Sequence, residues 1–295
     1  MAAKESVKTW STPVTFVESK PVPCAFCGDT RFRKAFECGG FGYVRCVHCG
    51  LVQMNPQPEA SRVLKRYEET YGEDYRAYER ANEESFLRLQ TLALKDAGFE
   101  RLERELFRQA CAAPAALDIG CATGALLHRL KQRGWRVRGV EISPSAEYAR
   151  NARALDVRSL PLEQNNFPSG SFDVVLASHL IEHLNDPALF VRETFRILKP
   201  GGRLYITTPN IAGFQARVFG SAWRSAIFDH LYLFSVKTLR ALLSRAGFRI
   251  ERVRTWGGLA AGTAPLWLKK CADTAVKWLG QGDVMIVRAR KPEQG

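Results

Sequence analysis

The chain has 295 residues, 46% of them hydrophobic, and its mean hydropathy is −0.20. This composition is that of an ordinary soluble protein, and no apolar run approaches the roughly 18 residues of a membrane span. Residues 1–20 lack the apolar core of a secretion signal and predict a flexible tail. We therefore expect a cytoplasmic protein whose eight cysteines are thiols or metal ligands rather than disulfides.

Positive charge dominates, with 43 Lys and Arg against 30 Asp and Glu and a formal net charge of +13. The excess is uneven, because residues 192–254 contain 12 basic and three acidic side chains. This pattern favours an anionic ligand, such as a phosphorylated sugar or a lipid head group, or a nucleic acid. Nucleic acid is the less favoured partner, because no RNA-binding module is recognisable. A solvated basic surface would give the same excess.

Four cysteines near the N-terminus have the spacing of a zinc site. Cys24 and Cys27 form one C-x2-C pair, and Cys46 and Cys49 form a second pair 18 residues later. Two such pairs can place four thiolates tetrahedrally around Zn²⁺, which closes the coordination sphere and predicts a structural ion. We therefore interpret residues 21–58 as a zinc ribbon. A redox pair or unligated thiols are the alternatives.

The next two regions differ in pattern. Residues 59–110 alternate charged and apolar side chains at helical spacing, which predicts a helical cap or linker over a cofactor cleft or, more simply, helices packed on the main domain. Residues 111–292 alternate strand and helix patterns and predict an α/β domain. Within that domain, residues 264–279 combine lysines with tryptophans. This segment predicts either peripheral membrane contact or an ordinary amphipathic helix.

One loop at the start of the α/β domain indicates a nucleotide-type cofactor. An apolar strand ends at Asp118, a turn with Gly120 and Gly124 follows, and a helix is predicted over 125–132. Glycines at such a turn let backbone N–H groups approach a ligand closely. The next strand ends on Glu141, which lies 23 positions after Asp118, where an acid binds a ribose at the carboxyl edge of a parallel sheet.

The same loop distinguishes between cofactors. The dinucleotide fingerprint G-x-G-x-x-G would fall on Gly120, Ala122 and Ala125, so two of its three glycines are missing. Asp118 would repel a pyrophosphate but not the ammonium and sulfonium groups of S-adenosylmethionine (SAM). Residues 118–124 resemble the D-x-G-x-G-x-G motif of class I SAM-dependent methyltransferases, with Ala122 in place of the middle glycine.

The resemblance continues along the chain. Residues 167–175 are similar to the approach to the fourth strand of that family, and residues 197–204 to the entry into the fifth. Residues 230–248 resemble the C-terminal part of the small-molecule branch. The resemblance implies a Rossmann-like α/β fold, with a mostly parallel seven-stranded sheet, helices on both faces, and SAM as cofactor.

Cofactor contacts follow from position and from the resemblance. The glycine turn should hold the methionine half, Glu141 should accept hydrogen bonds from the ribose, and Ile142 should pack on the adenine. By resemblance, a stretch near residue 162 lies on the other side of the adenine. The residues expected to bind SAM are Asp118, Gly120, Cys121, Ala122, Gly124, Glu141, Ile142, Leu162, Glu163 and Ser178.

Histidines are the candidate catalytic residues. If the acceptor atom is a hydroxyl oxygen, it needs a base, and His230 is the first candidate and His179 the second. His230 could instead have a packing or capping role beside Asp229, and an amine acceptor would need no strong base. Residues 179–183 also match the inverted zinc-peptidase pattern H-x-x-E-H. Because they directly follow a predicted strand, we expect no catalytic metal there and expect Glu182 and His183 to hold the loop.

Three functions are consistent with these features. The first is methyl transfer, at O or N, to a small molecule such as a sugar, a polysaccharide precursor or an isoprenoid or lipid-type acceptor. The second is rRNA or tRNA methylation, although residues 178–181 lack the Asn/Asp-Pro-Pro-aromatic motif of base-amine methylation. The third is a non-catalytic SAM-binding partner protein. The sequence indicates no oligomeric state.

Overall fold

The structure is a computed structural model. Residues 1–18 of the predicted tail, residues 59–72 of the predicted helical region and the predicted segment 264–279 lie outside the residues that it describes, whereas Ser19 and Lys20 form a short strand. The described residues are 19–58, 73–109, 111–257 and 280–293.

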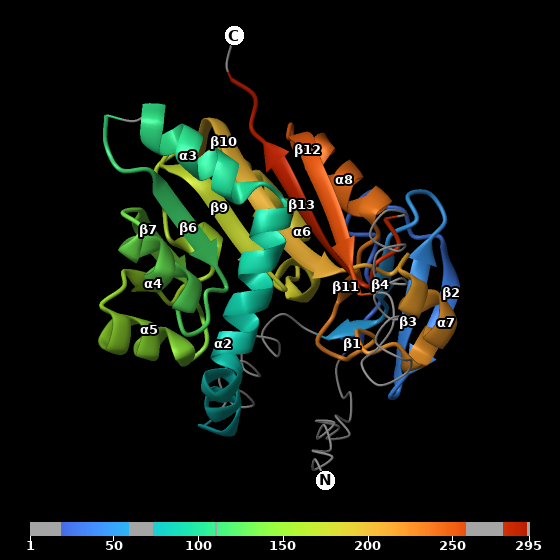
Figure 1. Cartoon of the computed structure of the whole chain (residues 1–295). Coiled ribbons are helices and arrows are strands. Elements are labelled where there is room, and N and C mark those ends of the chain that lie inside the picture. Colours follow the sequence, from blue (N-terminus) through green and yellow to red (C-terminus); the bar gives the residue numbers. More distant parts are fainter. Residues whose placement is uncertain (1–18, 59–72, 110, 258–279, 294–295) are drawn as a thin grey trace, which may run out of the picture.

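A seven-stranded sheet forms the centre of the molecule (Figure 1). Its strands are β6 (Ala115–Ile119), β7 (Arg136–Val140), β8 (Val157–Arg158), β9 (Phe172–Ser178), β10 (Leu198–Pro209), β12 (Arg249–Trp256) and β13 (Val284–Arg290). Their order is β12-β13-β10-β9-β6-β7-β8, and only β13 runs antiparallel to its neighbours. The predicted Rossmann-like fold class is confirmed.

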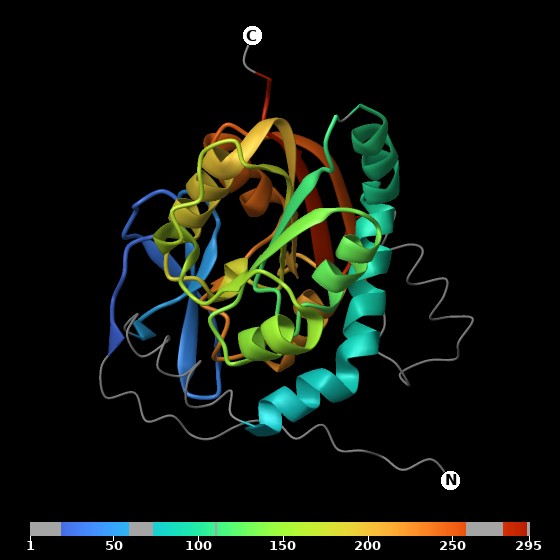
Figure 2. The same cartoon turned by 90° about the vertical axis from the view of Figure 1, so that its left-hand side faces the viewer.

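Helices cover both faces of the sheet (Figures 1 and 2). They are α2 (Glu73–Asp96), α3 (Phe99–Gln109), α4 (Ala125–Gln132), α5 (Ser145–Arg153), α6 (Pro187–Ile197), α7 (Phe214–Phe219) and α8 (Val236–Arg245), with the 3-10 turns η1 (Leu162–Gln164), η2 (Ile181–His183) and η3 (Gly220–Ala222). None of the helices in the described ranges is both long and apolar enough to cross a membrane.

Successive side chains of the central strands pack into different cores, so helices cover both faces of the sheet. In β9, Val174 and Leu176 join the core beneath α2, α3 and α4, whereas Val175 and Ala177 join the core that includes α6 and α8. Successive side chains of a strand point to opposite faces, so a strand covered on both sides is apolar throughout. Local signals place the helix starts: Asp186 caps α6, with Pro187 at its first position, and a capping box opens α8.

The N-terminal ribbon shares its sheet with the C-terminal half of the chain. Its strands β2 (Phe32–Cys38), β3 (Phe41–Cys46) and β4 (Val52–Met54) are joined by β11 (Tyr232–Leu233), in the order β11-β4-β3-β2. A separate pair joins β1 (Ser19–Lys20) to β5 (Gln57–Pro58). Buried ribbon side chains such as Tyr43 belong to the core beneath α6 and α8. The ribbon therefore packs against the seven-stranded sheet and shares its core.

Candidate cofactor and acceptor site

The predicted glycine turn lies between β6 and α4 at the carboxyl edge of the sheet. Gly120, Ala122 and Gly124 all have positive φ, at 73°, 47° and 75°. The Gly120 N–H donates to the Val140 carbonyl at 2.8 Å, which ties the turn to the end of β7. A Cβ added at Gly124 would lie 2.6 Å from Leu155 Cδ1, so this glycine lets α4 and α5 pack closely.

Ala122 occupies the position where the family motif has glycine, and it keeps the left-handed backbone. Left-handed φ costs a residue with a Cβ roughly 1–2 kcal/mol. The Ala122 N–H donates to Glu141 Oε2 at 2.8 Å, and this charge-assisted hydrogen bond offsets the strain. The departure from the motif therefore leaves the shape of the turn intact.

Glu141 follows β7 and is buried, with 8% of its surface exposed. Besides the Ala122 N–H on Oε2, its Oε1 accepts the Ser143 N–H at 2.8 Å. Each carboxylate oxygen can accept a second hydrogen bond, so the group is held in place while lone pairs remain for ribose hydroxyls. This is the geometry that the predicted role of Glu141 requires.

Asp118 is the penultimate residue of β6 and is almost completely buried. Burial, followed by the neighbouring charge of Glu141, raises the pKa of Asp118 to about 8. A cationic ligand beside two acids would relieve their repulsion and favour the ionised form of Asp118. SAM brings an ammonium and a sulfonium group, so its charge and the hydrogen-bonding capacity of its ribose fit these residues.

The expected adenine-contacting residues differ in exposure. Ile142 directly follows Glu141 and is half-buried, which suits a side chain that packs against a ligand. Leu162 is buried in η1 and Glu163 is exposed. Cys121 is buried beside the turn, and Ser178 is half-buried at the end of β9.

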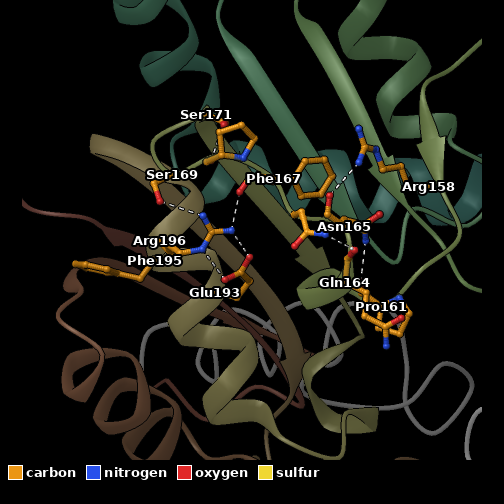
Figure 3. Close-up of polar contacts among 12 residues, drawn as sticks. Arg158, Pro161, Gln164, Asn165, Phe167, Ser169, Ser171, Glu193, Phe195 and Arg196 are labelled. Atoms are coloured by element: carbon orange, nitrogen blue, oxygen red, sulfur yellow. Dashed lines mark hydrogen bonds and ion pairs between the residues drawn. The ribbon is translucent and has the colours of Figure 1, made fainter.

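A buried asparagine that the sequence analysis did not single out shapes the loop around η1 (Figure 3). Asn165 Nδ2 donates to the carbonyls of Leu160 and Pro161 at 2.9 and 2.8 Å, and Arg158 donates to the Asn165 carbonyl at 2.9 Å. Farther along the loop, Arg196 holds the Phe167 carbonyl at 2.6 Å. These side chain to backbone bonds fix the loop that carries Leu162. No periodic signal reveals them in sequence.

The helix α2 contacts the glycine turn. Glu83 accepts the Thr123 hydroxyl at 2.5 Å and pairs with Arg153 at 2.5 Å. One turn earlier, Glu79 accepts the Ser145 hydroxyl at 2.5 Å. In Figure 1 the N-terminal part of α2 extends past the end of the sheet. These contacts place α2 against the turn and the start of α5.

His179 stands at the carboxyl end of β9, where the predicted loop position is confirmed. Its φ is 51°, its N–H donates to the Thr207 carbonyl, and its side chain is 50% exposed. His179 Nδ1 lies 3.3 Å from Glu182 Oε1. Burial of Glu182 is the largest effect and opposes its ionisation, but His179 and two further histidines lower the pKa of Glu182 to about 2. Glu182 is therefore a buried carboxylate that faces histidines.

His230, the other candidate base, is buried before β11. Its Nδ1 lies 2.8 Å from the Ser225 carbonyl, which can only accept, so this nitrogen carries the proton. Burial, followed by the charge of the nearby His183, lowers the pKa of His230 to about 4. His230 is therefore neutral near pH 7, with Nε2 unprotonated. The two predicted base candidates thus differ, one exposed and one buried.

The four ribbon cysteines lie together. Cys24 Sγ is 3.4 Å from Cys49 Sγ, Cys27 Sγ is 3.5 Å from Cys46 Sγ, and all four sulfurs lie within 4.8 Å of one another. These spacings are too long for a disulfide of about 2.05 Å. They suit a tetrahedral ion with Zn–S distances of about 2.3 Å. The set of donors therefore fits the predicted structural zinc.

A basic groove of about 740 Å³ opens next to the end of β10. It begins at Ile211, two residues after that strand, and runs along α8 from Ser235 to Ser244. Of the described residues that line it, none is acidic. The basic ones are Arg45, Arg217, Lys237 and Arg240. A smaller cavity beside Pro114 lies at the amino edge of the sheet. Ligands of open α/β sheets bind at the carboxyl edge, so the basic groove, rather than the smaller cavity, is the candidate site for an acceptor.

Known proteins are similar to this chain. Residues 86–253, more than half of the chain, match the family model described as "Methyltransferase domain". A ubiquinone biosynthesis O-methyltransferase of Xanthomonas euvesicatoria pv. vesicatoria is 30% identical over 171 residues, 52% of this chain and 70% of that protein. One of Pseudomonas aeruginosa (strain UCBPP-PA14) is 36% identical over 111 residues, 35% of this chain and 47% of that protein.

The solved structure of a SAM-dependent methyltransferase of Thermotoga maritima has the same fold, with a TM-score of 0.50 and 22% identity. The match covers 72% of this chain and 97% of that structure. Together with the Gly120 turn and Glu141, these matches define a class I SAM-dependent methyltransferase. The chain belongs to the methyltransferase domain family.

Proposed function

We propose that this enzyme transfers the methyl group of SAM to a hydroxyl oxygen of a small anionic acceptor. The similar proteins named ubiquinone biosynthesis O-methyltransferases support a small acceptor and an oxygen atom. The observation that carries the anionic character is the basic groove, because it has four cationic side chains and begins two residues after β10, whose carboxyl end lies at the same edge of the sheet as that of β7 before Glu141.

The groove restricts the chemistry of the acceptor. Lys237 and Arg240 are exposed on α8, and Arg217 is exposed on α7. Guanidinium and ammonium groups around one cavity bind phosphate or carboxylate oxygens through charge-assisted hydrogen bonds. Phosphorylated sugars, phosphorylated polysaccharide precursors and isoprenoid or lipid-type acceptors with an anionic head group are the classes that match.

The residues of the site have distinct parts in this reaction. When bound, SAM supplies a methyl group that its sulfonium makes electrophilic. Asp118 and Glu141 hold and orient the cofactor, and the contact between Glu83 of α2 and the turn shields it from water. His179 accepts the proton of the hydroxyl through Nε2, because the ionised Glu182 beside Nδ1 favours the tautomer with the proton on Nδ1. His230 is too buried to accept this proton.

The zinc ribbon is the second component of the proposal. Cys24, Cys27, Cys46 and Cys49 would bind one structural Zn²⁺, and residues 21–58 would fold around it. The close sulfur cluster supports this ion. The pairing of β4 with β11 suggests that the ion also stabilises the segment that carries His230.

Methyl transfer from labelled SAM to a panel of acceptors tests the proposal. The panel contains phosphorylated sugars, anionic isoprenoid-type hydroxy compounds, their uncharged counterparts, and RNA. We expect turnover with an anionic small molecule. In the double variant Lys237→Ala/Arg240→Ala, KM for that acceptor should rise at least tenfold while the affinity for SAM stays constant. Arg104→Ala/Arg108→Ala, two exposed arginines of α3, is the matched control.

Two outcomes would contradict this function. Equal turnover of charged and uncharged acceptors, unaffected by the groove variants, would show that the acceptor need not be anionic. Methylation of RNA with an affinity that falls steeply with salt would replace the small molecule by a nucleic acid.

A further inference from the structure

A compact group of metal-binding side chains lies behind His179. Glu182 and His183 belong to η2, and His230 comes from the segment before β11. One ligand atom of each of these three residues lies within 4.8 Å of the other two. The two imidazole rings are 4.7 Å apart at an interplanar angle of 78°. Glu182 is fully buried, His230 is 7% exposed and His183 is half-buried.

The protonation of both histidines follows from their backbone partners. His183 Nδ1 lies 2.9 Å from the Asp229 carbonyl, and His230 Nδ1 lies 2.8 Å from the Ser225 carbonyl. A carbonyl oxygen can only accept, so each Nδ1 carries a hydrogen, and Nε2 is the ring nitrogen that can bind a metal ion. Metal-binding histidines usually have this arrangement, with the second ring nitrogen donating to a carbonyl or carboxylate.

The carboxylate is only half satisfied. Glu182 Oε2 accepts the Thr208 hydroxyl at 2.9 Å. Glu182 Oε1 is buried and has no hydrogen-bond partner among the described residues, since His179 Nδ1 comes within 3.3 Å without the alignment of a hydrogen bond. A buried acceptor without a donor costs about 1–3 kcal/mol. Both imidazoles have Nδ1 on a backbone carbonyl, so Nε2 is the nitrogen left to bind a cation beside this buried carboxylate.

We propose that Glu182, His183 and His230 bind one divalent metal ion of the zinc class. Two imidazole nitrogens and one carboxylate oxygen are the donors of many Zn²⁺ sites and of two-histidine-one-carboxylate sites. Metal–ligand distances near 2.0–2.2 Å require ligand atoms about 3.3–4.4 Å apart, close to the present spacing. Three protein ligands leave a coordination position open, next to His179.

This site differs from the H-x-x-E-H peptidase pattern, for which we expected no metal. That pattern would use His179, whose side chain is half exposed at a residue with positive φ. The structure instead brings in His230, 47 positions after His183. The ribbon contributes to this placement, because Tyr43 Oη lies 2.7 Å from the His230 carbonyl and β11 pairs with β4.

The metal content of the 295-residue chain tests the site. The chain is purified with zinc, freed of loosely bound ions by gel filtration, and analysed by elemental mass spectrometry. We expect two equivalents of zinc in the wild type and one in His183→Gln, His230→Gln and Glu182→Gln. His128→Gln, a partly exposed histidine of α4, should keep two.

Cobalt substitution distinguishes the two ions without relying on variants. Cobalt bound by four thiolates has intense sulfur-to-metal charge-transfer bands, whereas cobalt bound by nitrogen and oxygen has only weak visible bands. We expect both signatures in the wild type, with the weak bands lost in His183→Gln. Calorimetry with SAM shows that the variant is folded and that its cofactor site is intact.

One equivalent of metal in the wild type, with purely thiolate-type cobalt bands and no change in His183→Gln, would overturn the proposal. A proton shared between His183 and Glu182 would then satisfy the cluster. This result is independent of the proposed acceptor, because metal content is measured in the absence of methyl transfer.

Discussion

Glu141 accepts the backbone N–H of Ala122 at 2.8 Å, so the residue that ends one strand holds the turn that follows the neighbouring strand. The same carboxylate is predicted to bind the ribose of SAM. One side chain thus links the conformation of the turn to cofactor binding, and its removal should affect both.

Glu141→Ala should lower the affinity for SAM by about 100-fold or more, because about two charge-assisted hydrogen bonds of roughly 1.5–3 kcal/mol each are lost. Calorimetry measures the change. Glu147→Ala, an exposed acid of α5, is the control and should leave the affinity unaltered. A similar loss in both variants, or in neither, would contradict the assigned role of Glu141.

The affinity for SAM should rise with pH up to about 8. The pKa of Asp118 is raised to about 8 by burial and by Glu141, and a cationic ligand lowers it, so binding releases a proton below that pH. The change should approach tenfold per pH unit at lower pH. Calorimetry at several pH values, in buffers with different heats of ionisation, measures the released proton. Asp118→Asn should abolish the dependence, and a dependence that persists in this variant would assign the proton to another group.

The raised pKa of Asp118 also predicts how the stability of the fold changes with pH. Folding raises the pKa of Asp118 from 3.8 to about 8. The contribution of Asp118 to the free energy of unfolding is therefore most favourable below pH 4 and is lost as pH rises through about 8. Asp118→Asn should therefore gain stability relative to the wild type as pH increases across that window. Urea unfolding at pH 5 and pH 8.5 measures the difference between the two proteins. A constant difference would mean that Asp118 does not titrate there.

Glu83→Ala should speed the release of SAM by roughly three- to tenfold, because α2 loses its hydrogen bond to Thr123 and its ion pair with Arg153, two interactions of about 1 kcal/mol each. Stopped-flow dissociation measures the rate. Glu84→Ala removes an exposed acid of the same helix and should change nothing. An unaltered rate in Glu83→Ala would exclude α2 as a cap over the cofactor.

Tyr43→Phe tests whether the ribbon supports the catalytic half. Tyr43 Oη lies 2.7 Å from the His230 carbonyl and 2.9 Å from that of Ile227, so its loss should destabilise the fold by about 1–2 kcal/mol. Turnover should fall, because His230 lies next to Glu182, the carboxylate beside the proposed base His179. The affinity for SAM should be retained, because Glu141 is not involved. Tyr78→Phe, on a half-exposed tyrosine of α2, is the control. Equal loss of turnover and of SAM affinity would point to general unfolding instead.

Several features could be predicted from local sequence. The helix over 125–132 and the position of His179 after a strand both agree with the structure. The close cysteine cluster agrees with the spacing of the C-x2-C pairs. These features depend on turn residues, apolar periodicity and short-range spacing, which are encoded within a few residues.

Asn165 shows the limit of that reasoning. Its side chain holds two carbonyls of the loop around η1, and nothing in its neighbourhood distinguishes it from an ordinary turn asparagine. The pKa of Asp118 could not be predicted from local sequence either, because it depends on the burial of the carboxyl group and on Glu141, 23 positions away. Such properties arise from the surroundings of a side chain in space.

Composition and motif spacing were enough to establish the α/β class, the SAM-type turn and the cysteine pairs, since each rests on interactions close in sequence. The pairing of β4 with β11 and the meeting of Glu182 and His183 with His230 depend on folding. Long-range strand pairing leaves no local period, so only the packed chain brings these residues together.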